Sequence, residues 1–408
     1  MGAQQERRDA LYRDPYPLYE RARRTAGLTF VPEMDAWLVA RDEDVREVLR
    51  RADDFSSANA LLPDVALPQA ALGVLARGFG PRQTVVSSDG AVHRRHRAPL
   101  NRALSTTRSA ALLPYARECA RELVAEVAAA EARSAELVEA YARKLPGLVV
   151  GRLIGLDRAD VPAAVHGGYR AEELLFHPLA PQEQLAAAED VVALQHLLDG
   201  YVRERRARPR QDLCSDLAAA AAPPGAALGE EQRHELVAHL QNLLIAGFLT
   251  TSALIATTLL HLLADRRQWE LLCADPGLVP AAVEEGLRFD SAVQAFRRVT
   301  TRPLELAGTP LPAGAALLVA YASANRDGRR YEDADAFDVG RAADRQHLAF
   351  GHGPHACPGS HLARGQLRLT LELFTELLPG LRLDAQRPAP RMRPTLIHRS
   401  PEALYVTW

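Results

Sequence analysis

Near its C-terminus the chain reads Phe350-Gly351-His352-Gly353-Pro354-His355-Ala356-Cys357-Pro358-Gly359. Gly351 and Gly353 carry no Cβ, so the backbone of this stretch can adopt positive φ and lie close against a flat partner. Further along, apolar residues recur at helical spacing, at Leu367, Leu371, Phe374 and Leu378. Cys357 therefore precedes a predicted helix, where the macrodipole and free backbone amides favour a thiolate over a thiol.

A thiolate held in this way suits the iron of a haem. Thiolate ligation pushes electron density onto the iron and favours cleavage of the O–O bond of dioxygen, so the expected chemistry is oxidative. The competing interpretation of a lone cysteine is a small, buried apolar residue. The glycines that surround Cys357 favour the ligand over that interpretation.

The same stretch resembles the ligand loop of the cytochrome P-450 family, in which Phe, Gly, Cys and Gly stand at fixed spacing. All four positions match, at Phe350, Gly353, Cys357 and Gly359. The resemblance implies that Cys357 is the axial iron ligand of haem b (iron protoporphyrin IX). It also implies that Phe350, Gly351 and Gly359 help to bind this cofactor.

The resemblance runs from about residue 14 to the C-terminus and implies a mainly α fold with a long buried central helix and a small β-rich region. We therefore expect an N-terminal tail over 1–13 and one haem domain over 14–408. Length alone permits two average domains, but no Gly/Ser-rich or charged linker divides the sequence. Residues 243–260 carry no charge and are long enough to span a membrane, yet Gly247 and several threonines favour a helix buried in a globule.

Composition narrows the range of partners. The formal net charge of −2 argues against a nucleic-acid partner. The four cysteines are scattered without metal or disulfide spacing, which fits a reducing cytosol. The first eight residues lack an apolar signal or anchor segment. We therefore expect a cytoplasmic monomer that does not associate with membranes.

The segment Glu285-Gly286-Leu287-Arg288 places an acid and an arginine on one face of a predicted helix, where they can form a charge-assisted bridge. It resembles the ExxR signature of the family, although the same spacing elsewhere is usually a solvated surface pair. Relatives add a third arginine from a later segment. Here Ala334-Asp335-Ala336-Phe337 has alanine at that place, and Arg341 is the substitute candidate.

Cationic side chains are expected at the two haem propionates. The run His93-Arg94-Arg95-His96-Arg97 resembles the HxxxR element of the family, which assigns His93 and Arg97 to a propionate. Arg298 and His355 fall where the family supplies the other donors. The competing interpretation of the run is a solvated basic patch. Other arginines are candidates for contact with an acidic ferredoxin: Arg94, Arg95, Arg345 and Arg364.

The predicted central helix contains Ala246-Gly247-Phe248-Leu249-Thr250-Thr251, and the resemblance places this stretch next to the iron. Ala246 and Gly247 permit the helix to open there, while Thr250 and Thr251 supply hydroxyls. Relatives usually carry an acid where this chain has Leu249, and that acid and the next threonine manage water and protons. Leucine cannot relay a proton.

Two interpretations of Leu249 remain open. Either it packs in the core while water or a substrate group delivers protons and ordinary hydroxylation continues. Or the chain oxidises a substrate N–H or O–H and couples or cyclises aromatic units without inserting oxygen, as some relatives from secondary metabolism do.

Substrate contacts are assigned by position in the family: Gln69, Asn242, Phe248, Ser291, Val293, Gln294, Phe296, Ile397 and His398. Asn242 lies four residues before Ala246 and so shares its face of the helix. The amides of Gln69, Asn242 and Gln294 suit a substrate with peptide-like groups, for example a cyclic dipeptide. Each of these residues taken alone is more often structural or exposed.

The sequence thus predicts a bacterial haem-thiolate oxidase of secondary metabolism. It would couple or cyclise aromatic natural-product units, using dioxygen and electrons from a ferredoxin and a ferredoxin reductase. The alternatives are a conventional monooxygenase that hydroxylates C–H bonds or forms epoxides, a peroxygenase driven by hydrogen peroxide, and a haem-binding protein without turnover.

Overall fold

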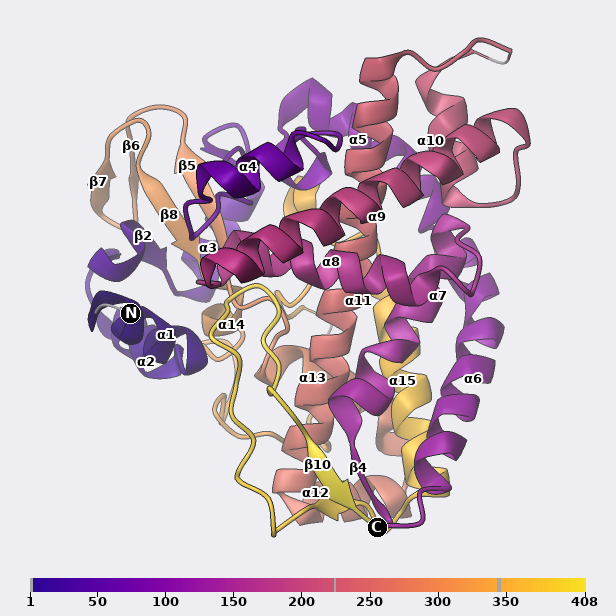
Figure 1. Ribbon diagram of the computed structural model, residues 1–408. Helices are drawn as coiled ribbons and strands as arrows, with labels where there is room; N and C mark the ends of the chain where they lie inside the picture. The colour runs from indigo at the N-terminus through magenta and orange to yellow at the C-terminus, as the bar shows by residue number, and fades with distance from the viewer. Residues whose placement is uncertain (1–2, 224, 343–345) are drawn as a thin grey trace. The chain divides into compact units, whose positions relative to one another are not determined.

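The computed structural model describes residues 3–223, 225–342 and 346–408, so the expected ferredoxin contact Arg345 lies outside the described residues. Helices dominate and the strands are short, which confirms the mainly α fold (Figure 1). The chain divides into two compact units. Unit 1 comprises Met1–Asn59, Leu113–Leu145 and Thr250–Trp408, and unit 2 comprises Ala60–Leu112 and Pro146–Leu249. Neither unit is one contiguous segment, and the single haem domain over 14–408 stays a prediction.

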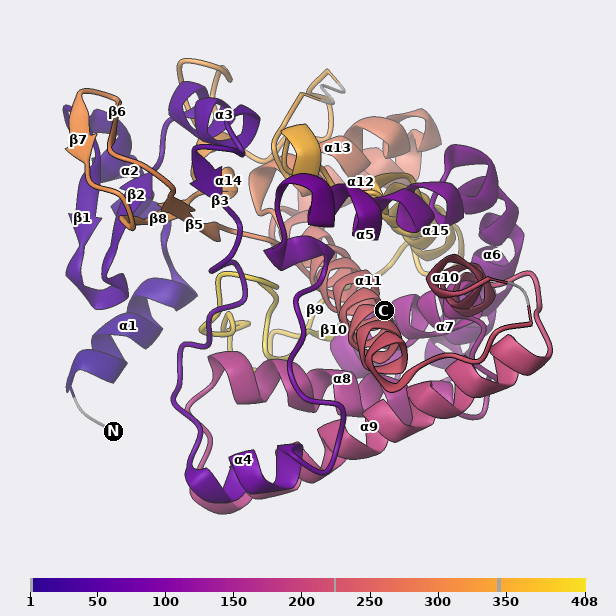
Figure 2. The same cartoon turned by 90° about the horizontal axis from the view of Figure 1, so that it is seen from above.

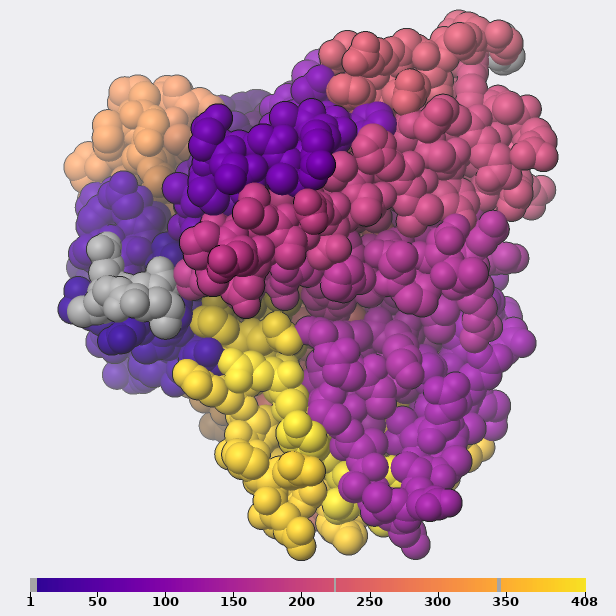
Figure 3. Space-filling view, viewed as in Figure 1, coloured from indigo at the N-terminus to yellow at the C-terminus, as the bar shows by residue number. Residues whose placement is uncertain are grey.

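Unit 2 is helical in the residues that the structure describes. It contains α4 (Gln69–Leu75), α5 (Gly90–Ala103), α8 (Val161–Phe176), α9 (Pro181–Ala207), α10 (Leu213–Ala221), most of α7 (Lys144–Ile154) and the 3-10 turn η2 (Val85–Ser87). Helices α4 and α8 both pack along α9, as Figures 1 and 2 show and as the surface view repeats (Figure 3). Their shared core is apolar and buried, and it includes Ala71 of α4, Leu174 of α8 and Val191 of α9.

The central helix α11 (Glu230–Ala264) contributes residues to both units. Among the described helices it is long and apolar enough to cross a membrane, but 67% of its most apolar window is buried inside the protein. Gly247 permits close packing, because a Cβ there would lie 2.7 Å from Val150 Cγ2 of α7. This burial agrees with the expectation of a core helix over residues 243–260.

Unit 1 contains the cysteine loop and most of the remaining helices. They are α1 (Ala3–Arg13), α2 (Tyr16–Arg24), α3 (Asp42–Arg50), α12 (Arg266–Ala274), α13 (Val279–Phe289), α14 (Tyr321–Ala324), α15 (Ser360–Leu377) and most of α6 (Thr106–Ala128). Short turns add η1 (Pro32–Met34), η3 (Val138–Ala142), η4 (Pro276–Leu278) and η5 (Gly353–His355). Buried leucines and Phe374 of α15 fill its inner face, as the periodicity of the sequence predicts.

The β-rich region also belongs to unit 1. The largest sheet has the order β1-β2-β8-β5-β3, built from Thr29–Val31, Ala36–Val39, Ala316–Val319, Phe296–Thr300 and Phe55–Ser56. Strands β2 and β8 are parallel and the other pairs are antiparallel. Smaller sheets join β4 (Ser134–Glu136), β10 (Tyr405–Thr407) and β9 (Arg382–Leu383), and β6 (Leu304–Leu306) with β7 (Thr309–Leu311). The pairing of β5 with β3 places Arg298 beside the segment that leads to Ser57.

The expected division into a tail over 1–13 and a haem domain stays a prediction, but the described part of the tail is folded. Residues 3–13 form helix α1, and Tyr12 is buried in the same apolar cluster as Tyr19 and Leu38 of unit 1. In addition, the Arg399 side chain donates a hydrogen bond of 2.8 Å to the carbonyl of Arg13. The family resemblance begins only at about residue 14, whereas Leu11 and Tyr12 of α1 pack in this apolar cluster.

Candidate active site

The cysteine loop adopts the backbone that its glycines predict. Gly351 and Gly353 have φ of 67° and 71°. A Cβ on Gly353 would also collide with the carbonyl of Leu49, so only glycine fits there without a shift of the chain. The Cys357 amide donates to the carbonyl of Phe350 at 2.8 Å, which folds the loop back on itself just before α15.

Exposure distinguishes Cys357 from the other cysteines. Its side chain is exposed, whereas Cys119 and Cys214 are buried and Cys273 is half-buried. Burial raises the pKa of the Cys214 thiol to about 12, so that residue stays a neutral thiol. An accessible sulfur at the head of a helix is the form that a metal ligand needs. The loop therefore fits an iron ligand.

Arg298 supplies a second observation that fits a haem. Its side chain is only 5% exposed on β5. Among the residues that the structure describes, no carboxylate pairs with its guanidinium, which donates to the carbonyl of Arg297 at 2.7 Å and contacts Tyr321. A buried cation requires an anionic partner, and a haem propionate provides one.

His355 lies next to the same part of the sheet. Its Nε2 is 3.1 Å from Ser57 Oγ, and Asn59 Nδ2 donates to the carbonyl of Arg298 at 3.1 Å. His355, two residues before Cys357, and Arg298 therefore both contact the segment 57–59 that follows β3. Both would hold the carboxylates of the cofactor from unit 1.

His93 and Arg97 occupy one face of α5 in unit 2. His93 is buried, and Arg97 Nε donates to Asn101 Oδ1 at 2.7 Å. Burial, followed by the positive charge of Arg97, lowers the pKa of His93. At neutral pH His93 would therefore offer an N–H donor rather than a charge, while Arg97 would supply the cation.

Three positions of the central helix retain accessible surface. Asn242 and Thr250 are half-buried and Ala246 is exposed, and they follow one another at four-residue spacing, on one face of α11. Gly247 faces Val150, and Thr251 is only 4% exposed. On α11 itself these positions supply one small residue, one amide and one hydroxyl.

Leu249 lies in the core. It is only 4% exposed and belongs to the apolar cluster of unit 2. The structure thus shows the packing that one of the two interpretations assumed. Position 249 therefore contributes no titratable group to the face of α11 that carries Asn242, Ala246 and Thr250.

The ExxR pair forms a buried bridge in unit 1. Arg288 Nε and Nη2 donate to the two carboxylate oxygens of Glu285, each at 2.8 Å, and both side chains are nearly inaccessible. Arg288 also donates to backbone carbonyls of a later segment, those of Asn325, Ala334 and Ala336. Arg341 completes the group, with Nε 3.3 Å from Glu285 Oε2. The structure therefore brings the three predicted residues together.

Sequence reasoning missed a second buried acid, Glu284. It accepts two hydrogen bonds from Arg364, at 2.7 and 2.9 Å, and lies 3.0 Å from His347 Nε2. Although burial acts in the opposite direction, His347 and Arg364 lower the pKa of Glu284 to about 2. The Arg364 guanidinium also lies 4.6 Å from the centre of the Phe350 ring, so this network supports the cysteine loop. The adjacent acids Glu284 and Glu285 were the available signal.

Arg364 is a less favourable ferredoxin contact than the sequence suggests, because its guanidinium pairs with Glu284 and lies over the Phe350 ring within unit 1. Arg94 and Arg95 are exposed on α5, as a docking role requires.

Three of the expected substrate contacts are fully buried: Ser291, Gln294 and Phe248. They stay predicted contacts, and each of them also contacts other parts of the protein. Ser291 Oγ donates to the carbonyl of Leu287, and Gln294 Nε2 donates to that of Ser291, each at 2.8 Å. Phe248 packs on Tyr169 with ring centres 4.9 Å apart.

The other expected contacts differ in exposure. His398 is buried, Gln69 is exposed at the start of α4, and the remaining ones are half-buried: Asn242, Val293, Phe296 and Ile397. These residues stay predicted contacts.

Pro358 follows the sulfur ligand directly and has no backbone N–H to donate to it. We expect Pro358→Leu to raise the reduction potential of the haem, because a new amide hydrogen bond to sulfur would weaken its donation to iron. Spectroelectrochemical titration measures the potential. Pro354→Leu, in the same loop but three residues from the ligand, is the matched control. An unchanged or lowered potential in Pro358→Leu contradicts the argument.

Comparison with known proteins gives one consistent result. The family described as Cytochrome P-450 matches residues 276–395, which include the buried bridge and the cysteine loop. Nocardicin C N-oxygenase of Nocardia uniformis subsp. tsuyamanensis is 34% identical over 385 residues, covering 92% of this chain and 90% of that protein. Mycinamicin IV hydroxylase/epoxidase of Micromonospora griseorubida is 34% identical over 379 residues, with the same coverage of 92% and 90%. Among solved structures, cytochrome P-450 CREJ in complex with (4-ethylphenyl) dihydrogen phosphate matches with a TM-score of 0.90 and 29% identity, covering 97% of this chain and 98% of that one.

Proposed function

This chain belongs to the cytochrome P-450 family, and on that premise we propose that it oxidises aromatic natural-product units so that they couple or cyclise. It is a haem-thiolate oxidoreductase with haem b as cofactor. Cys357 would be the residue that holds the iron. When bound, that cofactor supplies the iron at which dioxygen is activated. The observation that carries the proposal is the leucine at position 249, where relatives usually have an acid.

The position of Leu249 restricts the source of protons. A buried aliphatic side chain can neither hold nor move a proton, so on this face of α11 the hydroxyl of Thr250 is the group left for that task. A hydroxyl needs a further donor behind it, either water or the substrate itself. A substrate that brings a phenol O–H or an indole or amide N–H against Thr250 meets this need.

The same polar bond is the one whose oxidation leads to coupling. Removing the hydrogen from an aromatic O–H or N–H leaves a delocalised radical, and two such positions can join without inserted oxygen. A substrate chosen for its donor group is therefore also a substrate suited to coupling. Asn242, half-buried four residues before Ala246, offers an amide to a peptide-like group on such a molecule.

Oxygen insertion is the second candidate, in the form of C–H hydroxylation or epoxidation. The relatives favour it, because their names describe a hydroxylase/epoxidase, a dihydroxylase and an N-oxygenase. Retention of Thr250 is compatible with this outcome. Here the substrate or an ordered water would replace the missing acid.

One experiment separates these products. The haem-loaded enzyme is incubated with a ferredoxin, a ferredoxin reductase, a nicotinamide reductant and a panel of aromatic cyclic dipeptides, and products are identified by mass. Coupling or cyclisation gives products lighter than the joined substrates by two hydrogen atoms for each new bond. If every product is heavier by one oxygen atom, the coupling proposal is wrong and the second candidate holds. Turnover with hydrogen peroxide alone, faster than with the electron chain, identifies a peroxygenase instead.

The electron donor belongs to the same proposal. We expect a separate ferredoxin and its reductase to supply electrons, with the exposed Arg94 and Arg95 of α5 suited to an acidic partner. We further expect a cytoplasmic monomer. A steady consumption of reductant that depends on an organic substrate distinguishes an enzyme from a haem protein that only binds ligands.

A further inference from the structure

Two histidines and one glutamate converge in unit 2. His96 lies on α5, and Glu235 and His239 lie one turn apart on α11. His96 Nε2 is 2.8 Å and His239 Nε2 is 3.7 Å from the same carboxylate oxygen, Glu235 Oε1. The potential ligand atoms all lie within 4.8 Å of one another, and both imidazoles are buried while the carboxylate is partly open to solvent.

The hydrogen bonding around His96 is contradictory. Its Nε2 lies 2.8 Å from a carboxylate oxygen of Glu235, which can only accept, and 3.0 Å from Arg95 Nη2, which can only donate. One ring nitrogen cannot donate to the first and accept from the second at the same time. A bound cation would resolve the conflict, because the imidazole nitrogen and the carboxylate oxygen could then both act as electron-pair donors to it.

We propose that His96, Glu235 and His239 bind one divalent d-block cation, with zinc the best match, at the meeting of α5 and α11. Two imidazoles and one carboxylate form a nitrogen and oxygen ligand set that suits zinc. Tetrahedral zinc with such ligands requires neighbouring donor atoms about 3.3 Å apart. The distances from Glu235 Oε1 lie on either side of that value, so small side-chain rotations bring the ligands into place.

The protonation states agree with this proposal. Burial, followed by the neighbouring His96, lowers the pKa of His239 to about 4, so its imidazole is neutral at physiological pH. Although burial opposes ionisation of Glu235, its hydrogen bond with His96 and the charge of Arg95 lower its pKa. A neutral imidazole and an ionised carboxylate are the forms that bind metal.

Arg95 is the competitor for this site. Its side chain is 64% exposed, and its guanidinium lies 2.8 Å from Glu235 Oε1, where the cation would bind. The long exposed side chain can turn into solvent without disturbing the core. Its charge still opposes a divalent ion nearby, so removal of that charge should strengthen binding.

The test uses the haem-loaded full chain and zinc alone, so that the sulfur of Cys357 is already committed. Equilibrium dialysis against buffered zinc, followed by elemental analysis, gives the stoichiometry and affinity, and the melting temperature is measured with and without zinc. We expect one zinc per chain and a zinc-dependent rise in melting temperature. His96→Gln and His239→Gln should each weaken binding at least about tenfold. Arg95→Met should strengthen it roughly tenfold.

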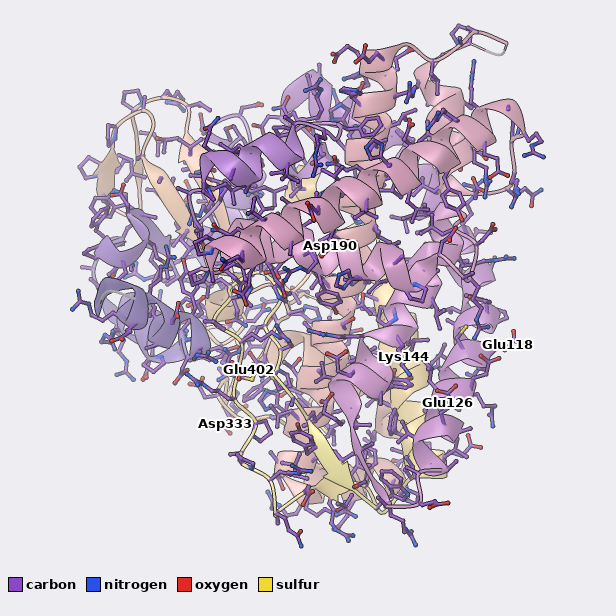
Figure 4. All side chains as sticks on the ribbon, in the orientation of Figure 1. Glu118, Glu126, Lys144, Asp190, Asp333 and Glu402 are labelled. Atoms are coloured by element: carbon purple, nitrogen blue, oxygen red, sulfur yellow. The ribbon has the colours of Figure 1, made fainter. Side chains whose placement is uncertain are left out.

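A matched control comes from another histidine and acid of unit 2. His166 Nε2 lies 3.2 Å from Asp190 Oδ2 at the surface, and Figure 4 marks Asp190 on α9. His166→Gln should leave zinc affinity unchanged. The proposal is overturned if the wild-type chain binds no zinc, if His96→Gln binds it as tightly as wild type, or if His166→Gln weakens it equally. The variants of the buried histidines could misfold, whereas the exposed Arg95 side chain can be replaced without disturbing the core. If Arg95→Met binds zinc more weakly than wild type, or equally well, the proposal is also overturned.

Discussion

Replacing Cys357 by histidine abolishes the red-shifted Soret band that the reduced protein is expected to show under carbon monoxide. That band reports a thiolate opposite the bound gas, and imidazole donates less electron density to the iron. Substrate oxidation should fall to background in the same variant, because the push from sulfur that favours O–O cleavage is lost. An absorbance spectrum of the reduced protein with carbon monoxide measures the first effect, and product formation measures the second.

Cys273→Ser is the control for this result. Cys273 is half-buried on α12, within the same unit, and has no place in the cysteine loop. The variant should keep both the band and the activity. A red-shifted band that survives in Cys357→His, or that is missing from the wild-type protein, would show that another group holds the iron.

The largest loss of stability is expected from Arg288→Met. Both Arg288 and Glu285 are almost inaccessible, so the substitution leaves a buried carboxylate without its main cation. Breaking such a pair costs about 3–5 kcal/mol of unfolding free energy. The backbone carbonyls of Asn325, Ala334 and Ala336 lose their donor as well, so the segment that they belong to should loosen. Chemical denaturation of the haem-loaded protein measures the change.

Arg341→Met provides the comparison. Arg341 contacts the same carboxylate at 3.3 Å, but its side chain is 19% exposed, so water can replace part of what is lost. We expect a loss of about 1 kcal/mol, as for ion pairs near the surface. Equal losses in the two variants would show that the third arginine is as important as the second, against the ranking that burial gives.

Local spacing explains which parts of the site were predictable. The loop around Cys357 and the pair Glu285 and Arg288 depend on residues a few positions apart, and their geometry follows from turn chemistry and helical periodicity. The central helix was likewise evident as an uncharged run that is too long for a strand. Each of these features lies within one element, and the structure has them where the sequence placed them.

Features that depend on the packing of distant segments were not predictable in the same way. Glu284, His347 and Arg364 come from three separate stretches of the chain. Their spacing in the sequence does not predict that they are in contact. Ser291 and Gln294 are predicted substrate contacts because of their position in the family, and nothing in the sequence indicates that both side chains are buried. A polar side chain that satisfies a neighbouring carbonyl looks the same in sequence as one that is free to bind a ligand.

Arg298 has a consequence for how the protein matures. The Arg298 guanidinium is nearly excluded from water, and no acidic residue among the described parts of the chain pairs with it. This buried charge destabilises the folded apoprotein. The propionates of the porphyrin supply the missing negative charge. Binding of the haem therefore stabilises the folded state around this sheet. Cells short of iron or of tetrapyrrole should accordingly contain less of this protein, because the less stable apoprotein is degraded more readily.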